Sequence, residues 1–410
     1  MARKMKDSGI EWIGEIPEGW EVVPVKRLCT MQAGKNLTSE QIAPEGTYPV
    51  YGGNGIRGFF SDYNCDGQFL TVGRQGALCG NVHKINGKVW ATEHAVITTP
   101  SSYTILDFLY YLLIGMDLNQ YVSSTAAQPG LAVGTLLNLK TCYPCSTLEQ
   151  TQISNYLNAK CSEIDVMLTK TRSSIEEYKK LKQAVITQAV TKGVRGEREM
   201  KDSGVEWIGE IPAEWSICPL KRLAAIQTGS TPSKTSSESF YSSIAGTPWI
   251  KPDNLGFSSS IETTAEFLTE EGCSVARTLP SNTVYVGCIG SRIGNCGYSL
   301  IPCACNQQIN ALIFNARMYW KYGWYLTIFQ EEQYMLLANG NVIQIINSTT
   351  QGNISCIVPS ISEQREITAY LDAKCAEIDG LIAKKEQLVK ELEGYKKSLI
   401  YEVVTGKREV

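Results

Sequence analysis

Histidine is scarce in this 410-residue chain, and familiar catalytic signatures are missing. Only His83 and His94 occur, both in the first half, so a histidine-dependent catalytic site cannot occur in each half. The sequence has no phosphate-binding loop of the GxxxxGK(S/T) type and no Asn-Pro-Pro-aromatic stretch of the kind found in amino-methyltransferases. No catalytic set of residues is therefore recognisable.

Long apolar runs are also lacking. The longest candidate, Phe108 to Ile114, is far shorter than the roughly 20 apolar residues of a membrane-spanning helix. Residues Met1 to Lys4 lead straight into polar sequence, so no secretory signal is expected. The expected location is the cytoplasm.

Paired cysteine motifs are too few for a zinc site. The 14 cysteines are scattered, and the one CxxC, at Cys142 and Cys145, corresponds in the second half to Cys356 alone. A structural zinc ion normally needs four ligands, so no metal site is expected. In a reducing cytoplasm the cysteines should be buried thiols.

The sequence does contain a duplicated frame. Residues 5–28 read MKDSGIEWIGEIPEGWEVVPVKRL and return at an offset of 195 as residues 200–223, MKDSGVEWIGEIPAEWSICPLKRL, with 17 of 24 pairs identical. Residues 149–191 align without a gap with residues 363–405, at an offset of 214. The chain therefore contains the frame, a variable stretch and a long segment, in that order, twice. This pattern indicates one task performed on two different targets.

The two long segments are predicted to be helices, because apolar residues recur at alternating steps of three and four without a proline. Gly193 and Gly406 are expected to end them, and the seam is imperfect at Thr171 and Lys385. Each helix needs a partner face, so we expect antiparallel pairing and partner contacts through Ile153, Leu157, Ile164, Leu168, Ile175, Ile367, Leu371, Ile378, Ile382, Val389 and Leu392.

The predicted fold class is mixed α/β (α+β), with two globular domains joined by two long antiparallel coiled-coil-like helices in a pseudo-twofold repeat. The expected parts are a domain over 1–146, a helix and junction over 147–199, a domain over 200–360 and a helix over 361–410. Joined end to end, the two termini recreate the internal junction of residues 193–204. We therefore expect the termini to lie close together.

The two variable stretches are predicted to be compact domains with one fold and different surfaces. Expected strands cover 48–51, 68–72, 88–90, 94–98, 247–250, 282–287 and 310–314, and expected helices cover 106–116 and 319–337. The two stretches also show a weak sequence similarity at the offset of 214, in which Gly73, Gly76, Gly80 and Asn81 match Gly287, Gly290, Gly294 and Asn295.

Positive charge is scarce in both variable stretches, and the net charge of the chain is −3. Residues 29–146 contain 6 basic and 7 acidic side chains, and residues 224–360 contain 6 and 8. Neither stretch could hold DNA tightly through phosphate neutralisation alone. If the protein reads DNA, a basic partner should supply much of the phosphate contact.

Basic and amide side chains flanked by glycines are the best candidates for contact with a target. Arg and Gln read guanine and adenine edges through paired hydrogen bonds, although such residues are also ordinary in polar loops. The candidate DNA-binding residues are Lys35, Asn54, Arg57, Arg74, Gln75, Lys84, Lys234, Lys251, Asn254, Ser291 and Arg292.

Two other motifs are interpreted structurally. Gly53 to Gly58 fits GxGxxG, but Phe59 to Tyr63 follows where a dinucleotide loop would need a helix, so a glycine-rich turn is expected. Trp12, Trp20, Trp207 and Trp215 belong to the unchanged frame, which cannot distinguish two targets. Packing is their expected role.

Each half contains the frame Glu-Trp-Ile-Gly-Glu-Ile-Pro followed by Trp, then a variable domain, and then Glu-Gln…Ile…Tyr-Leu…Lys…Glu-Ile-Asp on a long helix. This repeated order of motifs resembles the DNA-specificity subunit of Type I restriction–modification systems. The resemblance covers essentially the whole chain. Gln128-Pro-Gly-Leu131 also resembles the family pattern, whereas residues 350–354 depart from it.

This resemblance implies that each variable domain reads one half of a bipartite, asymmetric double-stranded DNA site. The helices would set the spacer and dock two modification subunits, which would bring S-adenosylmethionine and methylate adenine. Restriction subunits could join that complex, and the chain itself would hold no cofactor or metal and catalyse nothing. The alternatives are a coiled-coil scaffold that binds proteins through its variable domains, and an enzyme that binds a nucleotide at the glycine-rich turn.

Overall fold

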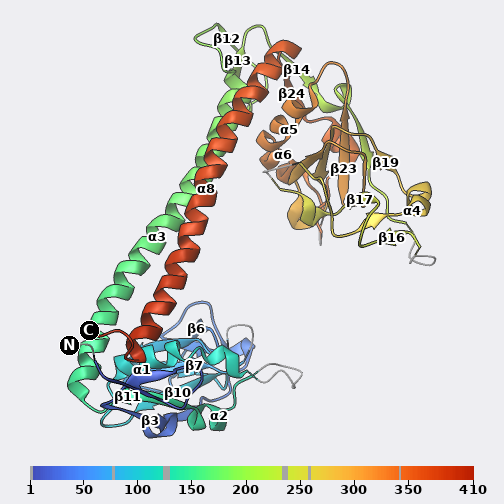
Figure 1. The fold of residues 1–410 in the computed structure, drawn as a ribbon. Helices are drawn as coiled ribbons and strands as arrows, with labels where there is room; N and C mark the ends of the chain where they lie inside the picture. Colours follow the sequence, from blue (N-terminus) through green and yellow to red (C-terminus); the bar gives the residue numbers. More distant parts are fainter. Residues whose placement is uncertain (1–2, 76–78, 123–129, 233–238, 257–259, 341–342) are drawn as a thin grey trace. The chain divides into compact units, whose positions relative to one another are not determined.

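The computed structural model describes residues 3–75, 79–122, 130–232, 239–256, 260–340 and 343–410. The chain divides into two compact units (Figure 1). Unit 1 contains Met1–Arg172 and Gln387–Val410, and unit 2 contains Ser173–Glu386. Each unit therefore combines one globular domain with part of each long helix.

Unit 1 begins with the frame and continues into the first globular domain. Its elements are β1 (Met5–Asp7), β2 (Glu15–Pro17), β3 (Trp20–Pro24), η1 (Val25–Arg27), β4 (Cys29–Ala33), η2 (Ser39–Gln41), β5 (Tyr48–Gly52), β6 (Gly55–Phe60), β7 (Gln68–Gly73), β8 (Val82–Asn86), β9 (Trp90–Ala91), β10 (Ala95–Pro100), α1 (Leu106–Gly115), η3 (Leu118–Tyr121), α2 (Val133–Asn138) and β11 (Lys140–Pro144).

Unit 2 repeats this order with additions. Its elements are β12 (Met200–Asp202), β13 (Glu210–Pro212), β14 (Ser216–Pro219), η4 (Leu220–Arg222), β15 (Ala224–Thr228), β16 (Tyr241–Ser242), β17 (Thr247–Ile250), η6 (Pro252–Asn254), β18 (Phe267–Leu268), α4 (Glu270–Val275), β19 (Thr278–Leu279), β20 (Thr283–Gly287), η7 (Gly290–Arg292), β21 (Cys296–Ser299), β22 (Cys303–Cys305), β23 (Ile309–Phe314), α5 (Trp320–Phe329), α6 (Glu331–Leu337), α7 (Ser348–Gly352) and β24 (Ser355–Val358).

Each of the two domains has its own central sheet, and the two sheets have the same strand arrangement. Antiparallel four-stranded sheets run in the order β4-β10-β7-β8 in unit 1 and β15-β23-β20-β21 in unit 2. Helices α1 and α5 occupy equivalent positions at an offset of 214 and bury apolar side chains in their domains' cores. Each fully buried Leu or Phe in such a core contributes about 1.5–3 kcal/mol. The predicted mixed fold with a shared domain architecture is confirmed.

The domains differ in the segment between the first and second core strands along the chain. These insert segments are residues 34–67 in unit 1 and 229–281 in unit 2, and they account for the whole 19-residue difference between the offsets 195 and 214. In unit 1 the segment contributes to a three-stranded sheet, β6-β5-β9, and in unit 2 to a five-stranded sheet, β16-β18-β17-β22-β19. The difference in length between the duplicated domains is therefore confined to one segment.

The two long helices, α3 (Thr147–Lys192) and α8 (Ile361–Val404), run antiparallel within each unit (Figure 1). Lys396 binds Asp165 in unit 1 at 2.6 Å, and Lys182 binds Asp379 in unit 2 at 2.7 Å. The offset of 214 converts one pair into the other, which is the register of a pseudo-twofold repeat. Of the seam residues, Ile382, Val389 and Leu392 are partly exposed and the other eight are buried.

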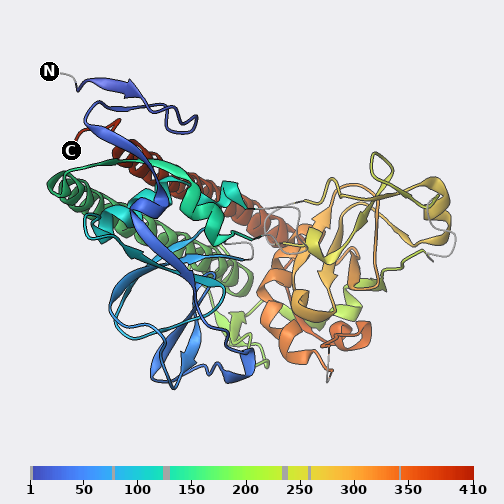
Figure 2. The same ribbon diagram turned by 90° about the horizontal axis from the view of Figure 1, so that it is seen from below.

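The terminal regions lie side by side in unit 1, as both views show (Figures 1 and 2). The Tyr401 hydroxyl donates to the Trp12 carbonyl oxygen at 2.9 Å, and Arg3 lines a hollow together with Lys407. The predicted proximity of the two ends is confirmed.

A repeated clamp holds the frame to the start of each long helix. In unit 1 the Glu149 carboxylate accepts hydrogen bonds from Trp20 Nε1, at 3.0 Å, and from Arg3. In unit 2 Glu363 accepts from Trp215 Nε1 at 2.9 Å and from Arg198 at 2.6 Å. The packing role predicted for the tryptophans is confirmed for these two, which are each 1% exposed.

A second clamp joins each helix to its globular domain. The Gln150 side chain is fully buried, accepts from the Ile105 backbone N–H at 2.8 Å and donates to the Pro144 carbonyl oxygen. Gln364 makes the same contacts with Tyr319 and Pro359. Buried amides satisfied in this way fix the orientation of the domain on its helix.

Some sequence-based boundaries were wrong. The single helix expected over 319–337 is two helices, α5 and α6, broken at Gln330, where φ is −85° and ψ is 1°. The strand expected over 88–90 lies at Trp90–Ala91, and strands β8 and β21 were not predicted. Among the described residues, no helix is both long and apolar enough to cross a membrane.

Candidate nucleic-acid interface

A tight hairpin presents Asn54 at one edge of unit 1. Strands β5 and β6 pair as far as Gly52 and Gly55, which leaves Gly53 and Asn54 as the turn, and Gly55 has a φ of 95° that favours glycine. The GxGxxG stretch is thus a turn between two strands, as predicted, and no helix follows it. Asn54 is exposed on this turn.

The hairpin lies against the loop that follows β7. A Cβ atom on Gly53 would lie 2.9 Å from the Gln75 carbonyl oxygen, and Asn81 Nδ2 donates to Asn54 Oδ1 at 3.0 Å. The Arg57 side chain crosses Gly52, where a Cβ atom would overlap it. The structure therefore brings Asn54, Arg57 and Gln75 together from two distant segments.

Arg74 and Gln75 are held in place by the end of the Gln-Pro-Gly-Leu motif. Arg74 Nε donates to the Leu131 carbonyl oxygen at 3.3 Å, and Gln75 forms a β-bridge with Gly130. Gln128 itself lies outside the described residues. Lys35 is exposed next to β9, with its backbone N–H bonded to Ala91.

Unit 2 gathers its candidates in the corresponding place. Arg292, on η7 after β20, lies 3.4 Å from Asp253 on η6, and Ser291 precedes it on the same exposed turn. The Asn254 side chain accepts from the Lys251 backbone N–H at 2.8 Å, which closes η6. Lys251 Nζ also pairs with Glu266 at 2.5 Å. The remaining candidate, Lys234, lies outside the described residues.

Both units thus use one arrangement: the insert segment meets the loop that follows the core strand β7 or β20. We call these two places the loop clusters; they are Asn54, Arg57, Arg74, Gln75 and Asn81 in unit 1, and Lys251, Asp253, Asn254, Ser291 and Arg292 in unit 2. Guanidinium and amide groups there are suited to paired hydrogen bonds with base edges. Asn81 and Asp253 were missed from the sequence, although each lies within two residues of a glycine-rich loop or a predicted candidate.

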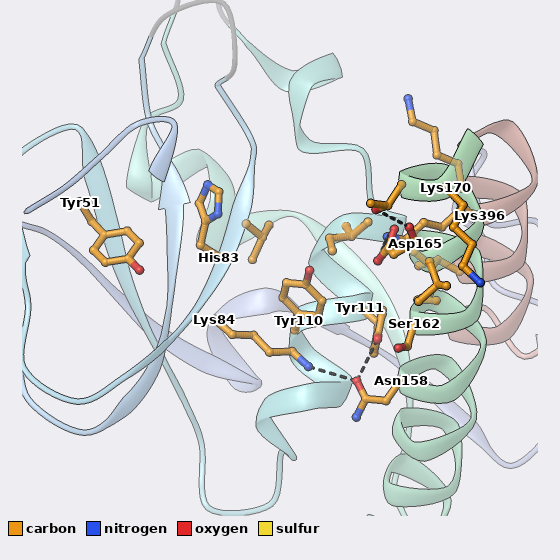
Figure 3. Close-up of a pocket in the computed structure, with 17 residues that line it drawn as sticks. Tyr51, His83, Lys84, Tyr110, Tyr111, Asn158, Ser162, Asp165, Lys170 and Lys396 are labelled. Atoms are coloured by element: carbon orange, nitrogen blue, oxygen red, sulfur yellow. Dashed lines mark hydrogen bonds and ion pairs between the residues drawn. The ribbon is translucent and has the colours of Figure 1, made fainter. Parts of the chain in front are cut away.

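Lys84 is engaged elsewhere. Its ammonium binds Asp107 at 2.8 Å and Asn158 Oδ1 at 3.2 Å, and it lies 4.5 Å from the centre of the Tyr110 ring (Figure 3). These contacts join the globular domain to α3. Lys84 therefore serves domain packing in this structure and does not belong to the loop cluster.

A cleft of about 850 Å³ opens in unit 1 between the globular domain and the helices (Figure 3). Lys170, Lys396 and Lys397 line it on the helix side, and His83 lines it on the domain side. No local pattern in the sequence indicates this cleft, since its basic residues come from three separate segments. Asp165 also lines the cleft and binds Lys396, so Lys170 and Lys397 are the lysines on the helix side that could contact an anionic backbone.

The described residues offer little for metal or thiol chemistry. No group of three or more His, Cys, Asp or Glu side chains among them is positioned to hold a metal ion. Burial raises the pKa of the Cys142 and Cys305 thiols to about 12, so these thiols stay protonated and unreactive at neutral pH.

Comparison with known proteins agrees with this architecture. A family model described as the Type I restriction modification DNA specificity domain matches residues 17–177 and 212–391. The chain is 44% identical over 121 residues to the Type I restriction enzyme EcoprrI specificity subunit of Escherichia coli, a match that spans 28% of this chain and 30% of that subunit.

Two other similarities extend over nearly the whole chain. The Type I restriction enzyme MjaVIII specificity subunit of Methanocaldococcus jannaschii is 25% identical over 422 residues, covering 96% of this chain and 93% of that subunit. A solved structure of complex assembly and conformational transition in the type I R-M system contains a chain of the same fold, with a TM-score of 0.71 at 14% identity, covering 96% of this chain and 99% of that chain. This chain belongs to the family of Type I restriction–modification DNA specificity subunits.

Proposed function

We propose that this protein reads a bipartite, asymmetric DNA sequence, with one half-site read by each unit, as the specificity subunit of a Type I restriction–modification complex. One observation carries the proposal. The two domains keep a common sheet and frame, and they differ in the insert segments, which reach the same loop position in both units. A protein that handles two targets in one geometry needs this combination of constant scaffold and changed surface.

The loop clusters would read bases in the major groove. The Arg292 guanidinium would pair with guanine O6 and N7, and the Gln75 and Asn54 amides would pair with adenine N6 and N7. Each insert segment would then set which bases its unit accepts. The fixed loop after β7 or β20 would set the position of the domain on the duplex.

Partner subunits would supply what this chain lacks. With 6 basic residues in each variable stretch and a net charge of −3, the chain has little capacity to neutralise phosphates. Two methyltransferase subunits, docked on the paired helices, would bring S-adenosylmethionine, the catalytic groups and additional positive charge. The chain would contribute recognition and no catalytic side chain, and the same complex could also accept restriction subunits.

The first experiment exchanges an insert segment. The chain is expressed with its modification subunit, and methylated positions in the host genome are mapped. Replacing residues 34–67 by the corresponding segment of another specificity subunit should change one half-site and leave the other half-site and the spacer intact. Methylation at the original full site in the exchanged protein would refute the role of the segment. The coiled-coil scaffold alternative, which the family membership does not favour, predicts no sequence-dependent methylation at all.

A second experiment tests one side chain. Arg292→Ala should relax the specificity at one base pair of one half-site and weaken binding of the assembled complex by roughly 5- to 150-fold, since a bidentate base contact is worth about 1–3 kcal/mol. Arg195→Ala is the matched control, because Arg195 is an exposed arginine in the same unit that pairs with Glu366 away from the loop cluster. Equal losses in both variants would show a general charge effect and not base recognition.

A further inference from the structure

Asn158 on α3 is the centre of a polar contact between the first globular domain and its helix. Its Oδ1 accepts hydrogen bonds from the Tyr111 hydroxyl at 2.9 Å and from Lys84 Nζ at 3.2 Å (Figure 3). Its Nδ2 donates to Asp107 Oδ2 at 2.7 Å. The amide therefore uses both its acceptor and its donor toward the domain.

The equivalent position in unit 2 is Asp372, at an offset of 214. Its Oδ1 accepts from the Tyr325 hydroxyl at 2.8 Å, and its Oδ2 accepts from Lys321 Nζ at 2.6 Å. The Lys321 ammonium also lies 5.9 Å from the centre of the Tyr298 ring. Here the helix side chain only accepts.

The two contacts have one constant member and three changed members. Tyr111 and Tyr325 correspond, and both donate to the helix residue. Asp107 is replaced by Lys321, Lys84 by Tyr298, and Asn158 by Asp372, each at the offset of 214. In unit 1 the acidic side chain lies on the domain, whereas in unit 2 it lies on the helix. The lysine that pairs with it lies on β8 in unit 1 and on α5 in unit 2.

We propose that Asn158 and Asp372 determine which globular domain can dock on which long helix. The Gln150 and Gln364 clamps and the two tyrosines do not discriminate between the domains, because they are the same in both units. With the first domain on the second helix, Asp107 would meet the Asp372 carboxylate, and the two acids would share Lys84. With the second domain on the first helix, Lys321 would meet the Asn158 amide oxygen, which it can still use as an acceptor.

Only the docking of the first domain on the second helix is therefore disfavoured. The partial burial of the two carboxylates strengthens their repulsion. The Asp107 side chain is 35% exposed and that of Asp372 is 38% exposed, so water screens a like-charge contact only in part. Burial raises the pKa of Asp107, but hydrogen bonds from Lys84 and Asn158 outweigh it and hold the pKa below its usual value. Asp107 is ionised at neutral pH, and a facing carboxylate would be repelled.

The first test exchanges the two groups within unit 1 of the full-length chain and follows thermal unfolding. Asn158→Asp should lower the melting temperature by about 2–6 °C, because it places two carboxylates in contact and removes a donor. Adding Asp107→Asn to Asn158→Asp restores an amide–carboxylate pair with the positions reversed, and most of the loss should be recovered. A double variant as unstable as Asn158→Asp alone would overturn the proposal, since it would show that only shape matters at residue 158.

The second test uses one substitution in two contexts. In the native chain, Asp372→Asn removes the anion that Lys321 binds and should lower the melting temperature. In a hybrid that carries residues 29–146 in place of residues 224–360, the same Asp372→Asn change removes the clash with the incoming Asp107 and should raise both the melting temperature and the folded yield. The same sign in both contexts would overturn the proposal. Neither test uses DNA, so a failure of the proposed function and a failure of this inference are distinguishable.

Discussion

At the scale of single residues, the two copies of the Trp–Glu–Arg clamp differ in burial. The Glu363 side chain is 2% exposed, whereas that of Glu149 is 27% exposed. Removing one partner of a buried ion pair leaves the other charge without compensation, at a cost of about 3–5 kcal/mol, whereas an exposed pair is worth about 1 kcal/mol or less. We expect Glu363→Ala to destabilise unit 2 by about 3 kcal/mol and Glu149→Ala to destabilise unit 1 by about 1 kcal/mol. Chemical unfolding followed by tryptophan fluorescence measures both.

The control for this comparison is Glu366→Ala. Glu366 lies one turn along the same helix and pairs only at the surface, with Arg195, so its loss should change the free energy of unfolding by less than about 0.5 kcal/mol. Equal effects of the changes at Glu363 and Glu149 would show that burial of the carboxylate does not set the strength of the clamp.

His83 makes the stability of the first domain depend on pH. Burial lowers the pKa of this imidazole, and its Nε2 is buried without a protein partner. The unfolded chain therefore binds the proton more readily, so stability is complete above the unfolded pKa of about 6.5 and is lost as the pH falls below it toward the folded pKa. His83→Gln should lose less thermal stability than the native chain between pH 7.5 and pH 5.5. The matched control is His94→Gln, at the other histidine, beside Glu93; an equal gain in acid stability from both changes would contradict a specific role of His83.

At the scale of elements, one glycine within α8 and one just after its end have opposite requirements. Gly406, just after its end, has a φ of 72°, and an added Cβ atom would overlap Pro17 in the frame. Gly394, within the helix, has no atom within 4 Å of such a Cβ. Gly406→Ala should therefore destabilise unit 1 by about 1–3 kcal/mol, whereas Gly394→Ala should stabilise it by about 0.5–1 kcal/mol. Urea unfolding midpoints test the two signs, and a loss in both variants would contradict this account of the helix end.

Elements were predictable from the sequence where they were long or strongly apolar. The periodic seam located α3 and α8 within about two residues at their ends, because many repeats of the pattern reinforce each other. A short strand such as β8, with His83 and Lys84 among its five residues, has no such reinforcement. The break at Gln330 was missed because neither glycine nor proline marks it.

The candidate site was predictable as a set of residues and not as an arrangement. The glycine-flanked loops at residues 73–76 and 290–294 were found because glycine marks tight backbone turns. The contact of Gly53 with Gln75, and of Arg292 with Asp253, depends on tertiary packing that no local pattern encodes. For the same reason the sequence does not reveal that Lys84, a candidate DNA-binding residue, contacts Asp107 and Asn158 where the domain meets the helix.

At the scale of the whole molecule, the duplication separates the residues that fix the geometry from the residues that differ between the two units. The frame, the clamps and the helix register are repeated, and the insert segments and the Asn158 and Asp372 contacts are not. Residues that repeat fix geometry, and residues that differ fix what each unit accepts. A change in the repeated helices should therefore alter the spacing of the two half-sites and not their sequences.

This expectation can be tested by removing the same length from both helices. Deleting residues 173–179 from α3 and residues 380–386 from α8 removes two helical turns from facing stretches, about 10 Å at ~1.5 Å per residue, and preserves the faces that pair. Because base pairs in B-form DNA are ~3.4 Å apart, the spacer recognised by the methylating complex should shorten by about three base pairs. A deletion in α3 alone serves as the control, since it moves Lys182 out of register with Asp379 and should lower the folded yield. Methylome mapping that finds the original spacer after the paired deletion would show that the helices do not measure the distance between the half-sites.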